Sequence, residues 1–280
     1  MSFWLKAAGA AGAYLLAVKP SSRRDWMKQF AGHYYAHRGL YDNTAGVPEN
    51  SCTAFRRAVE HGYGIELDVQ LSKDGIPVVF HDDTLPRMAK DKTGGPVHGY
   101  VSDYTFSQLR EFHLLDTDEK IPTLQEVLDI VHGEVPLIVE MKTHGKDHSC
   151  PVCAAADRLL QNYRGLYVVE SFNPFAVRWY QKNRPDVIRG QLSDAYTKQA
   201  KYRRPSYFAS EYLLYNFLVK PDFIAYNSKH AGNLSREITR RLYRVPSVAW
   251  TIQSDDELNA MQKRYDLFIF EAFMPKKKEN

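Results

Sequence analysis

Acidic side chains stand in two short apolar segments that have the composition of buried strands. Glu66 and Asp68 are two residues apart in the first segment, and Glu140 stands two residues before Lys142 in the second. Side chains at positions i and i+2 of a strand point to the same face. Each pair therefore projects together, and we expect three carboxylates inside the fold or at its mouth.

Three buried carboxylates repel one another and resist the loss of water unless positive charge offsets them. A divalent cation supplies that charge, and hard oxygen ligands suit Ca²⁺ or Mg²⁺. We therefore expect Glu66, Asp68 and Glu140 to hold one Ca²⁺ or Mg²⁺. The alternative is that these carboxylates only pair with Arg or Lys across the interior, as Glu140 would with Lys142.

Two histidines end predicted strands: His37 directly follows one, and His81 closes another. Imidazole titrates near neutral pH, so one ring can accept a proton from a nucleophile while the other donates one to a leaving oxygen. Phosphodiester hydrolysis needs both transfers, and positive charge around the phosphoryl oxygens, which the cation, Arg38 and Lys142 would supply. The sequence contains no G-x-S-x-G elbow, P-loop or dinucleotide fingerprint.

Strand-like and helix-like segments alternate from Phe30 onward. The predicted strands are Tyr34–Ala36, Ile65–Gln70, Leu137–Met141, Tyr167–Ser171, Val187–Gln191, Phe223–Tyr226, Val248–Thr251 and Leu267–Glu271. The predicted helices are Ser51–His61, Thr123–Val131, Ala154–Tyr163, Pro174–Asn183, Leu234–Leu242 and Asp255–Lys263, with Ser51 and Asp255 as N-caps. This order predicts an α/β fold with a parallel sheet. Eight strands in about 250 residues favour a closed (β/α)8 TIM-type barrel.

The chain divides into segments of different composition. We expect an apolar N-terminal segment at 1–29, the barrel at 30–275 and a basic tail at 276–280. Residues 83–120 break the β-then-α alternation and form an insertion within the barrel. A long insertion at a barrel connection usually serves the active-site side.

The N-terminal segment is apolar from Phe3 to Val18 apart from Lys6. It is short for a spanning helix, which needs about 20 apolar residues. Its stronger charge follows the apolar run, unlike that of a secretory signal, and would keep the next domain in the cytoplasm. We expect residues 3–18 to attach a cytoplasmic enzyme to the inner face of a membrane. The alternative is an amphipathic helix packed on the barrel.

Composition excludes several classes of protein. The 280 residues are 44% apolar and 25% charged, as in ordinary globular proteins, and the net charge of +4 is too small to indicate a nucleic-acid partner. Three cysteines make a disulfide framework improbable. Cys150 and Cys153 form a C-x-x-C near His144 and His148, but no second half of a zinc site follows, so thiols at a helix start are favoured over a zinc or redox protein.

Seven motifs stand in order along the chain: His37-Arg38-Gly39, Pro48-Glu49-Asn50-Ser51, Glu66-Leu67-Asp68-Val69, Asp74-Gly75, Pro77-Val78-Val79-Phe80-His81-Asp82, Ile121-Pro122-Thr123-Leu124-Gln125-Glu126-Val127-Leu128 and Glu140-Met141-Lys142. Together they resemble the glycerophosphodiester phosphodiesterase family. The likeness is specific from about Tyr35 to Asn173. It continues more weakly through Ala249–Ile252 to the last strand.

The resemblance implies a TIM-type barrel with a small subdomain inserted after the second strand. It also implies hydrolysis of a glycerophosphodiester to an alcohol and glycerol 3-phosphate, by water or through the substrate's own hydroxyl. The matching residues are Glu66, Asp68 and Glu140 for one divalent cation, His37 and His81 for acid/base chemistry, Arg38 and Lys142 for phosphate, and Glu49 and Asn50 for the network beside the metal.

Two features depart from the family's pattern. Glu271 stands where a Thr-Asp-x-Pro motif usually follows the last strand, and Gln253 stands where Asn is common. We expect both to lie away from the acid/base and metal residues and to affect only the fit of the substrate. Phe172, Tyr226 and Trp250 end predicted strands and are candidates for an alcohol-binding pocket, Trp250 foremost, although core packing explains each equally well.

Two other functions remain open. A lysophospholipase D-type enzyme would use the same site on membrane lysophospholipids, and the apolar N-terminal segment favours it. A non-catalytic phosphate-binding barrel would keep the fold without the reaction. The complete set of histidines and carboxylates favours an enzyme.

Overall fold

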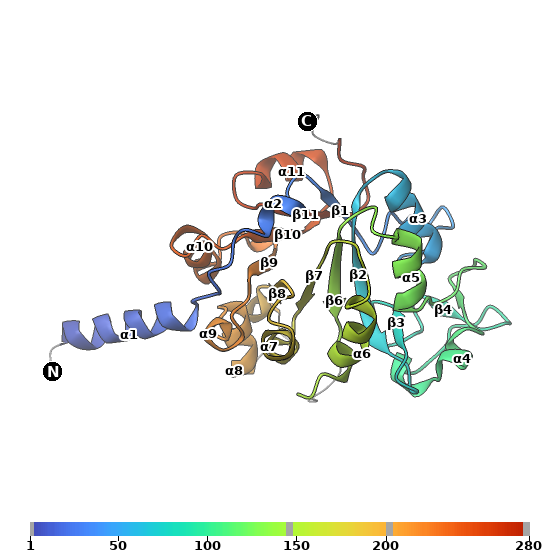
Figure 1. Ribbon diagram of the computed structural model, residues 1–280, viewed down its shortest axis with the longest axis horizontal. Coiled ribbons are helices and arrows are strands. Elements are labelled where there is room, and N and C mark those ends of the chain that lie inside the picture. Colours follow the sequence, from blue (N-terminus) through green and yellow to red (C-terminus); the bar gives the residue numbers. More distant parts are fainter. Residues whose placement is uncertain (1–2, 144–147, 200–203, 277–280) are drawn as a thin grey trace.

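Eight parallel strands close into a barrel in the computed structural model, which describes residues 3–143, 148–199 and 204–276 (Figure 1). The barrel strands are β1 (Tyr34–His37), β2 (Gly64–Leu71), β6 (Leu137–Met141), β7 (Tyr167–Ser171), β8 (Arg189–Ser193), β9 (Phe223–Asn227), β10 (Ser247–Ile252) and β11 (Leu267–Phe270). Each pairs with the next, and β11 pairs with β1 to close the ring. The predicted TIM-type barrel is confirmed.

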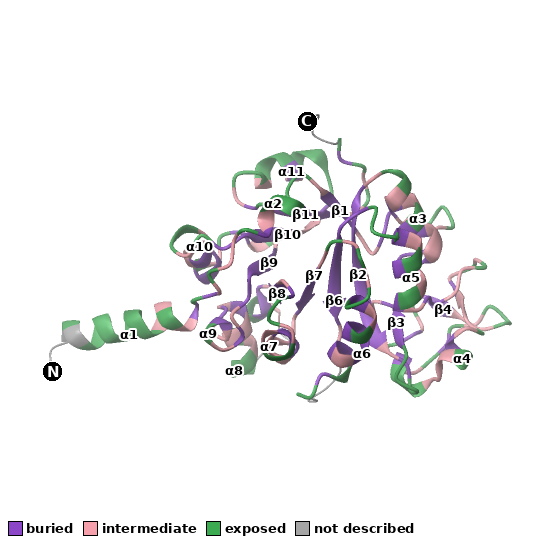
Figure 2. Cartoon of the chain, viewed as in Figure 1, coloured by how far each residue is buried: buried purple, intermediate pink, exposed green. Residues whose placement is uncertain are grey.

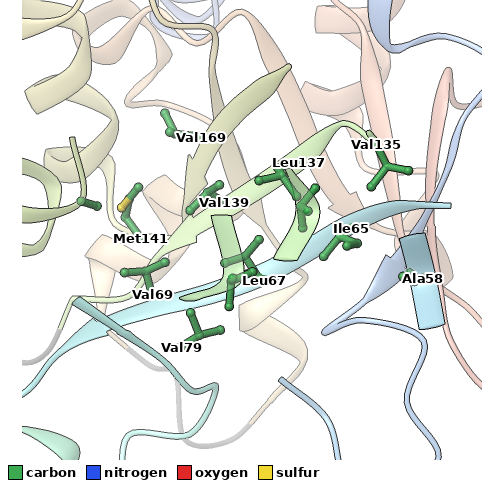
Figure 3. Close-up of a cluster of buried hydrophobic side chains, with 14 of the residues drawn as sticks. Ala58, Ile65, Leu67, Val69, Val79, Val135, Leu137, Val139, Met141 and Val169 are labelled. Atoms are coloured by element: carbon green, nitrogen blue, oxygen red, sulfur yellow. The ribbon is translucent and has the colours of Figure 1, made fainter. Parts of the chain in front are cut away.

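Helices surround the strands, which are buried on both faces (Figure 2). The helices are α3 (Cys52–Glu60), α5 (Leu124–Val131), α6 (Pro151–Leu160), α7 (Pro174–Asn183), α8 (Pro205–Glu211), α9 (Asn216–Val219), α10 (Leu234–Arg241) and α11 (Asp255–Met261). Outward-facing side chains such as Leu67, Val69 and Val139 build the layer between strands and helices (Figure 3). Burial of both faces explains why strands such as β11 are apolar without alternation, whereas β2 alternates apolar residues with the polar residues Glu66, Asp68 and Gln70.

The N-terminal ends of the strands are closed by aromatic side chains. Trp26 and Phe30 of the short α2 region (Met27–Phe30) pack against barrel-interior residues, and the rings of Trp26 and Phe223 lie 5.6 Å apart. The hydroxyl of Tyr35 donates to the carbonyl of Phe30 at 3.1 Å. This end of the barrel is therefore filled, and polar side chains gather at the opposite end, where TIM barrels place their active sites.

A small unit follows the second barrel strand. The strand β3 (Pro77–Val79) pairs antiparallel with β2, and residues 83–120 then form β4 (Ala89–Lys90), η1 (Val101–Asp103), α4 (Phe106–Leu109) and β5 (His113–Leu114). These elements lie on one side of the barrel (Figure 1). They enclose an apolar cluster of their own that includes Leu85, Met88, Leu109 and Leu114.

Helix α1 (Phe3–Ala17) extends away from the barrel (Figure 1). Its C-terminal end is held by Tyr14, whose hydroxyl is 2.6 Å from that of Ser235, and by Tyr243, which donates to the Leu15 carbonyl at 2.8 Å. Trp4 is 78% exposed. The alternative of a helix packed along the barrel is therefore wrong. No helix in the described part of the chain has the length and hydrophobicity to cross a bilayer.

Three predicted boundaries need correction. The N-cap of α11 is Ser254, whose hydroxyl accepts from the Glu257 amide at 3.2 Å, rather than Asp255. Helix α6 begins at Pro151, because proline suits a first helical turn, and not at Ala154. Strand β8 begins later than predicted because the Val187 amide still bonds to the Arg184 carbonyl in the preceding turn. Ser51 caps α3 as predicted, accepting from the Ala54 amide at 3.1 Å.

Replacing Gly190 by alanine tests the close packing inside the barrel. A Cβ at this position would lie 2.1 Å from the ring of Phe223, which is fully buried and has no room to move. We expect Gly190→Ala to lower the free energy of unfolding by about 1–3 kcal/mol in urea titrations. Gly12→Ala is the control, because nothing lies within 4 Å of a Cβ there. An equal loss in both variants would contradict this explanation.

Candidate active site

The three predicted metal ligands meet inside the mouth of the barrel. Asp68 on β2 stands directly opposite Glu140 on β6 in the strand register, and Glu66 lies two residues before Asp68. All three side chains are buried, and one carboxylate oxygen of each lies within 4.8 Å of the others. The strand register therefore brings together residues that are more than 70 positions apart in the chain.

The charges at this cluster do not balance within the protein. Burial raises the pKa of Glu66 and Glu140, and the neighbouring carboxylates raise that of Glu66 further. Burial also acts on Asp68, but Lys142, His81 and Arg38 outweigh it and lower the Asp68 pKa. Repulsion and lost hydration therefore act against charge on Glu66 and Glu140.

Pairing with basic side chains explains part of the cluster. Lys142 Nζ lies 3.2 Å from both Asp68 Oδ1 and Glu140 Oε1, and Arg38 Nε lies 3.7 Å from Asp68 Oδ2. Glu66 has a weaker set of contacts: it accepts the backbone amide of Arg38 at 3.0 Å. Lys142 and Arg38 do not neutralise the three carboxylates of Glu66, Asp68 and Glu140, because the positive charge of Arg38 is shared with a further carboxylate, that of Glu49. The oxygen donor set fits a divalent cation.

A strained turn after β1 aims Arg38 at the cluster. Arg38 and Gly39 both have positive φ, 55° and 81°, and a Cβ at Gly39 would come within 2.9 Å of Ala54. Asn50 also has a positive φ of 54°, and its amide donates to Asp68 Oδ2 at 3.0 Å. Left-handed non-glycine residues concentrate at functional sites, where the surrounding structure holds them in place.

His37 is oriented by a network that includes both departures from the family's pattern. Its Nδ1 lies 2.6 Å from Glu271 Oε2, and its Nε2 faces Glu66 Oε2 at 3.9 Å. Tyr41 and Gln253 donate to Glu271 at 2.9 and 2.8 Å. The expectation that Glu271 and Gln253 lie away from the acid/base residues is therefore wrong. They come close because β11 pairs with β1.

Burial lowers the pKa of His37, and this effect outweighs the opposing hydrogen bond with Glu271. Burial alone would raise the pKa of Glu271. The hydrogen bond with His37, the charge of that imidazole, and the hydrogen bonds from Gln253 and Tyr41 outweigh burial and lower the pKa to about 2. The Glu271 carboxylate therefore holds the proton of His37 on Nδ1, which leaves the Nε2 lone pair directed at the cluster.

His81 has a similar support. Its Nδ1 lies 2.7 Å from Asp82 Oδ1, and Arg87 donates to Asp82 and also to both oxygens of Glu49. Glu49 in turn accepts from Arg38 at 2.7 Å. Glu49, predicted to belong to the network beside the metal, therefore links Arg38 to the segment that carries His81. Glu49, His81 and Asp82 also lie close enough to hold an ion, but Arg87 already pairs with both carboxylates.

Two cavities meet at the mouth. One of about 450 Å³ contains the functional groups, including His37, Arg38, Glu66 and His81, and a second of about 590 Å³ contains Lys142. Glu140, Phe172 and Trp250 line both, with the rings of Phe172 and Trp250 5.5 Å apart and perpendicular. Tyr226 lines neither: it is fully buried, and its hydroxyl donates to the Glu211 carbonyl at 3.3 Å. Its predicted place in an alcohol pocket is wrong.

The cysteines are remote from this chemistry. Cys52, Cys150 and Cys153 all lie in the described part of the chain, and none forms a disulfide. Cys150 and Cys153 are buried, and the groups of described residues that could hold a metal ion contain only His, Asp and Glu. His144 and the basic tail beyond Lys276 lie outside the described residues.

The residues of the mouth that sequence reasoning did not assign to the site include Tyr41, Arg87, Glu170 and Glu271. Glu170 carried a usable signal, because it is a carboxylate within an apolar strand, as Glu140 is. Arg87 belongs to the inserted segment, where no periodic pattern indicates direction. Tyr41 and Glu271 become neighbours only when the barrel closes.

A model of the glycerophosphoryl diester phosphodiesterase family matches residues 37–266. The chain belongs to this family. The match runs from His37, at the end of β1, to the residue before β11, so it covers the barrel except for most of β1 and all of β11. It includes every residue predicted from the sequence to act in the site, whereas Glu271 lies beyond it.

Relatives named as glycerophosphodiester phosphodiesterases are similar to part of this chain. A glycerophosphodiester phosphodiesterase of Caldanaerobacter subterraneus subsp. tengcongensis is 33% identical over 169 residues, which cover 56% of this chain and 65% of the relative. Glycerophosphodiester phosphodiesterase 1 of Homo sapiens is 34% identical over 166 residues, 55% of this chain and 46% of the relative. The aligned part thus spans less than two thirds of each relative's length.

Solved structures share the fold. A phosphodiesterase of Oleispira antarctica, in complex with the product sn-glycerol-3-phosphate, superposes with a TM-score of 0.68 at 22% identity, over 87% of this chain and 94% of that one. The glycerophosphodiester phosphodiesterase of Thermotoga maritima superposes with a TM-score of 0.60 at 27% identity, over 85% and 94%.

Glu271→Gln tests the support of His37. The pKa of Glu271, lowered to about 2, contributes stability that is complete above about pH 4.5 and is lost as the pH falls towards 2. We expect the unaltered chain to exceed the variant in unfolding free energy by up to about 3 kcal/mol above pH 4.5, and by progressively less below it. Urea unfolding across this range measures the difference.

The control for this prediction is the same substitution in a His37→Ala background. Because the effect belongs to the pair, it should shrink once the imidazole is gone. A difference between the proteins that stays constant from pH 7 to pH 3 would contradict the assigned pKa of Glu271.

Proposed function

We propose that this phosphodiesterase-family chain hydrolyses glycerophosphodiesters to an alcohol and glycerol 3-phosphate, with one Ca²⁺ or Mg²⁺ held by Glu66, Asp68 and Glu140. The observation that carries the proposal is the group of three carboxylates within 4.8 Å, with the oriented histidines His37 and His81 beside it. We propose that this site binds a small-molecule substrate. Its excess of carboxylates does not favour a nucleic acid.

The phosphate would bind between the basic side chains and the carboxylate cluster. Asp68 and Glu140 raise the pKa of Lys142 above its usual value despite burial, so its ammonium is charged at neutral pH. Arg38, held by Glu49, presents a guanidinium from the other side. A bound divalent cation would add positive charge at the phosphoryl oxygens. Lys142 and Arg38 would orient the phosphate and offset the charge that develops on it.

The two histidines would move the protons. His37 has a lowered pKa and an Nε2 lone pair directed into the mouth, which suits a group that accepts a proton from the attacking water or from the substrate's own hydroxyl. His81, held at Nδ1 by Asp82, would return a proton from Nε2 to the leaving oxygen. The 590 Å³ cavity behind Trp250 and Phe172 would receive the leaving alcohol.

A release assay tests this function. We expect glycerol 3-phosphate to form from glycerophosphocholine, EDTA to abolish the reaction, and added Ca²⁺ or Mg²⁺ to restore it. His37→Ala and His81→Ala should each reduce turnover by a factor on the order of 10² to 10⁴. His98→Ala, at an exposed position in the inserted segment, is the control. Near-normal turnover in either active-site variant would refute the acid/base assignment, and binding of phosphate without turnover would favour a non-catalytic barrel.

An alternative substrate is a lysophospholipid, and helix α1 supports it. Trp4 and Leu16 are 78% and 64% exposed on this apolar helix. Its 15 residues give a length of about 22 Å, short of the roughly 30 Å bilayer core, so it would lie in the membrane surface. Lys6 within the helix and Lys19 after it favour anionic lipid. We propose that this arm attaches the chain to a membrane and brings the mouth to lysolipids.

Vesicle sedimentation tests the attachment. We expect the chain to bind vesicles of phosphatidylcholine mixed with phosphatidylglycerol, and a Trp4→Ser, Leu16→Ser double variant to lose most of this binding. Turnover of lysophosphatidylcholine in vesicles should fall with it, while turnover of glycerophosphocholine should not. Tyr100→Ser, which removes a side chain 51% exposed elsewhere, is the control. Equal sedimentation of all three proteins would remove the membrane proposal.

A further inference from the structure

A fourth carboxylate lies at the level of the predicted cation site. In the strand register Asp68 on β2 stands opposite Glu140 on β6, and Glu140 stands opposite Glu170 on β7. Register partners in a parallel sheet point to the same face. Glu170 therefore points into the barrel beside Glu140, and it lines the same cavity as Glu66, Glu140 and the two histidines.

Glu170 is buried without a compensating group. The residue is only 2% exposed, and its Oε2 has no hydrogen-bond partner among the residues that the structure describes. The charges that act on it are Glu140, Asp68 and Lys142, and the Lys142 ammonium is already placed 3.2 Å from both of these carboxylates. A buried carboxylate oxygen that lacks a donor is costly, so such an oxygen indicates a partner that binds there.

Carboxylates outnumber cations at the described mouth of the barrel. The basic side chains there are Arg38, Arg87 and Lys142, and the carboxylates are Glu49, Glu66, Asp68, Asp82, Glu140, Glu170 and Glu271. Arg87 is committed to Glu49 and Asp82, and His37 to Glu271. Positive charge is therefore lacking on the side of the cluster where Glu170 stands beside Glu140.

We propose that Glu170 is a fourth carboxylate ligand of the cation that Glu66, Asp68 and Glu140 hold, and that the site consequently prefers Ca²⁺ to Mg²⁺. The inference rests on the cation site of the proposed function. Ca²⁺ accepts six to eight oxygen ligands with flexible geometry, whereas Mg²⁺ demands an octahedron and retains several waters. Glu170 would approach the cation from the side of Glu140 that is opposite Asp68, as the order of the strands requires.

Metal binding by Glu170→Gln tests the proposal without reference to catalysis. Calorimetric titration of metal-free protein should show Ca²⁺ bound at least about tenfold more weakly by the variant, with Mg²⁺ affected less. Tb³⁺ bound in place of Ca²⁺ should carry at least one further water in Glu170→Ala, which leaves no side-chain oxygen to act as a ligand, measured from luminescence lifetimes in H₂O and D₂O. Glu211→Gln is the matched control, because Glu211 is also buried, 4% exposed, but lines neither cavity.

A second variant separates ligation from charge. Glu170→Asp keeps the charge on a side chain shorter by one methylene, so it should also weaken Ca²⁺ binding, and it serves as the test if Glu170→Gln does not fold. Ca²⁺ affinity within twofold of the unaltered chain in Glu170→Gln or Glu170→Asp, or an unchanged water count in Glu170→Ala, would overturn the proposal. If the unaltered chain bound neither Ca²⁺ nor Mg²⁺, the cation site of the proposed function would fall as well.

Discussion

Repulsion among buried carboxylates is the constraint on which the rest of this active site depends. Glu66, Asp68, Glu140 and Glu170 project from three adjacent strands into the interior of the barrel, where all four residues are buried. In such a medium like charges destabilise one another strongly unless positive charge stands between them. Arg38 and Lys142 offset part of the repulsion by direct pairing. A divalent cation would offset more of it, and the same excess of negative charge that disfavours the cluster on its own would provide the affinity for that ion.

Hydrogen bonds from neighbouring residues fix the positions of Arg38 and Asp68 in the site. Glu49 holds the guanidinium of Arg38 from outside the cluster, and Asn50 holds one oxygen of Asp68. The residues of this loop are fixed by left-handed backbone conformations that only the surrounding contacts maintain. The basic side chains are therefore positioned beside the carboxylates while part of their charge remains available to a phosphate.

Closure of the barrel orients the first histidine. Because β11 pairs with β1, the carboxylate of Glu271 reaches the far nitrogen of His37 and leaves the near nitrogen directed at the cluster. The second histidine, His81, is held in the same way at Nδ1 by the carboxylate of the adjacent Asp82. The support of His37 is built from the first and last barrel strands, and that of His81 from the residue next to it in the sequence. Both hold an imidazole by Nδ1, so both present Nε2 to the mouth.

The sequence alone determined the features that depend on residues close together in the chain, namely strand composition, side-chain alternation and helix capping. Apolar runs of strand length, the β-then-α order and the spacing of Glu66, Asp68 and Glu140 were sufficient to predict the barrel and the inward direction of these carboxylates, because strand alternation is a local property. Ser51 was identified as a cap for the same reason. Boundaries such as the start of β8 were missed by two residues, since a turn hydrogen bond there outweighs strand propensity.

Only the tertiary structure decided which groups support the chemistry. Glu271, Gln253 and Tyr41 gather behind His37 through the pairing of the first and last barrel strands, a contact across more than 230 residues that no local pattern encodes. Arg87 reaches Glu49 from an insertion without periodicity, and Tyr226, which ends a strand as Trp250 nearly does, turns out to be buried. Side-chain direction along a strand is set by neighbours in sequence, whereas charge balance and hydrogen bonding are set by neighbours in space.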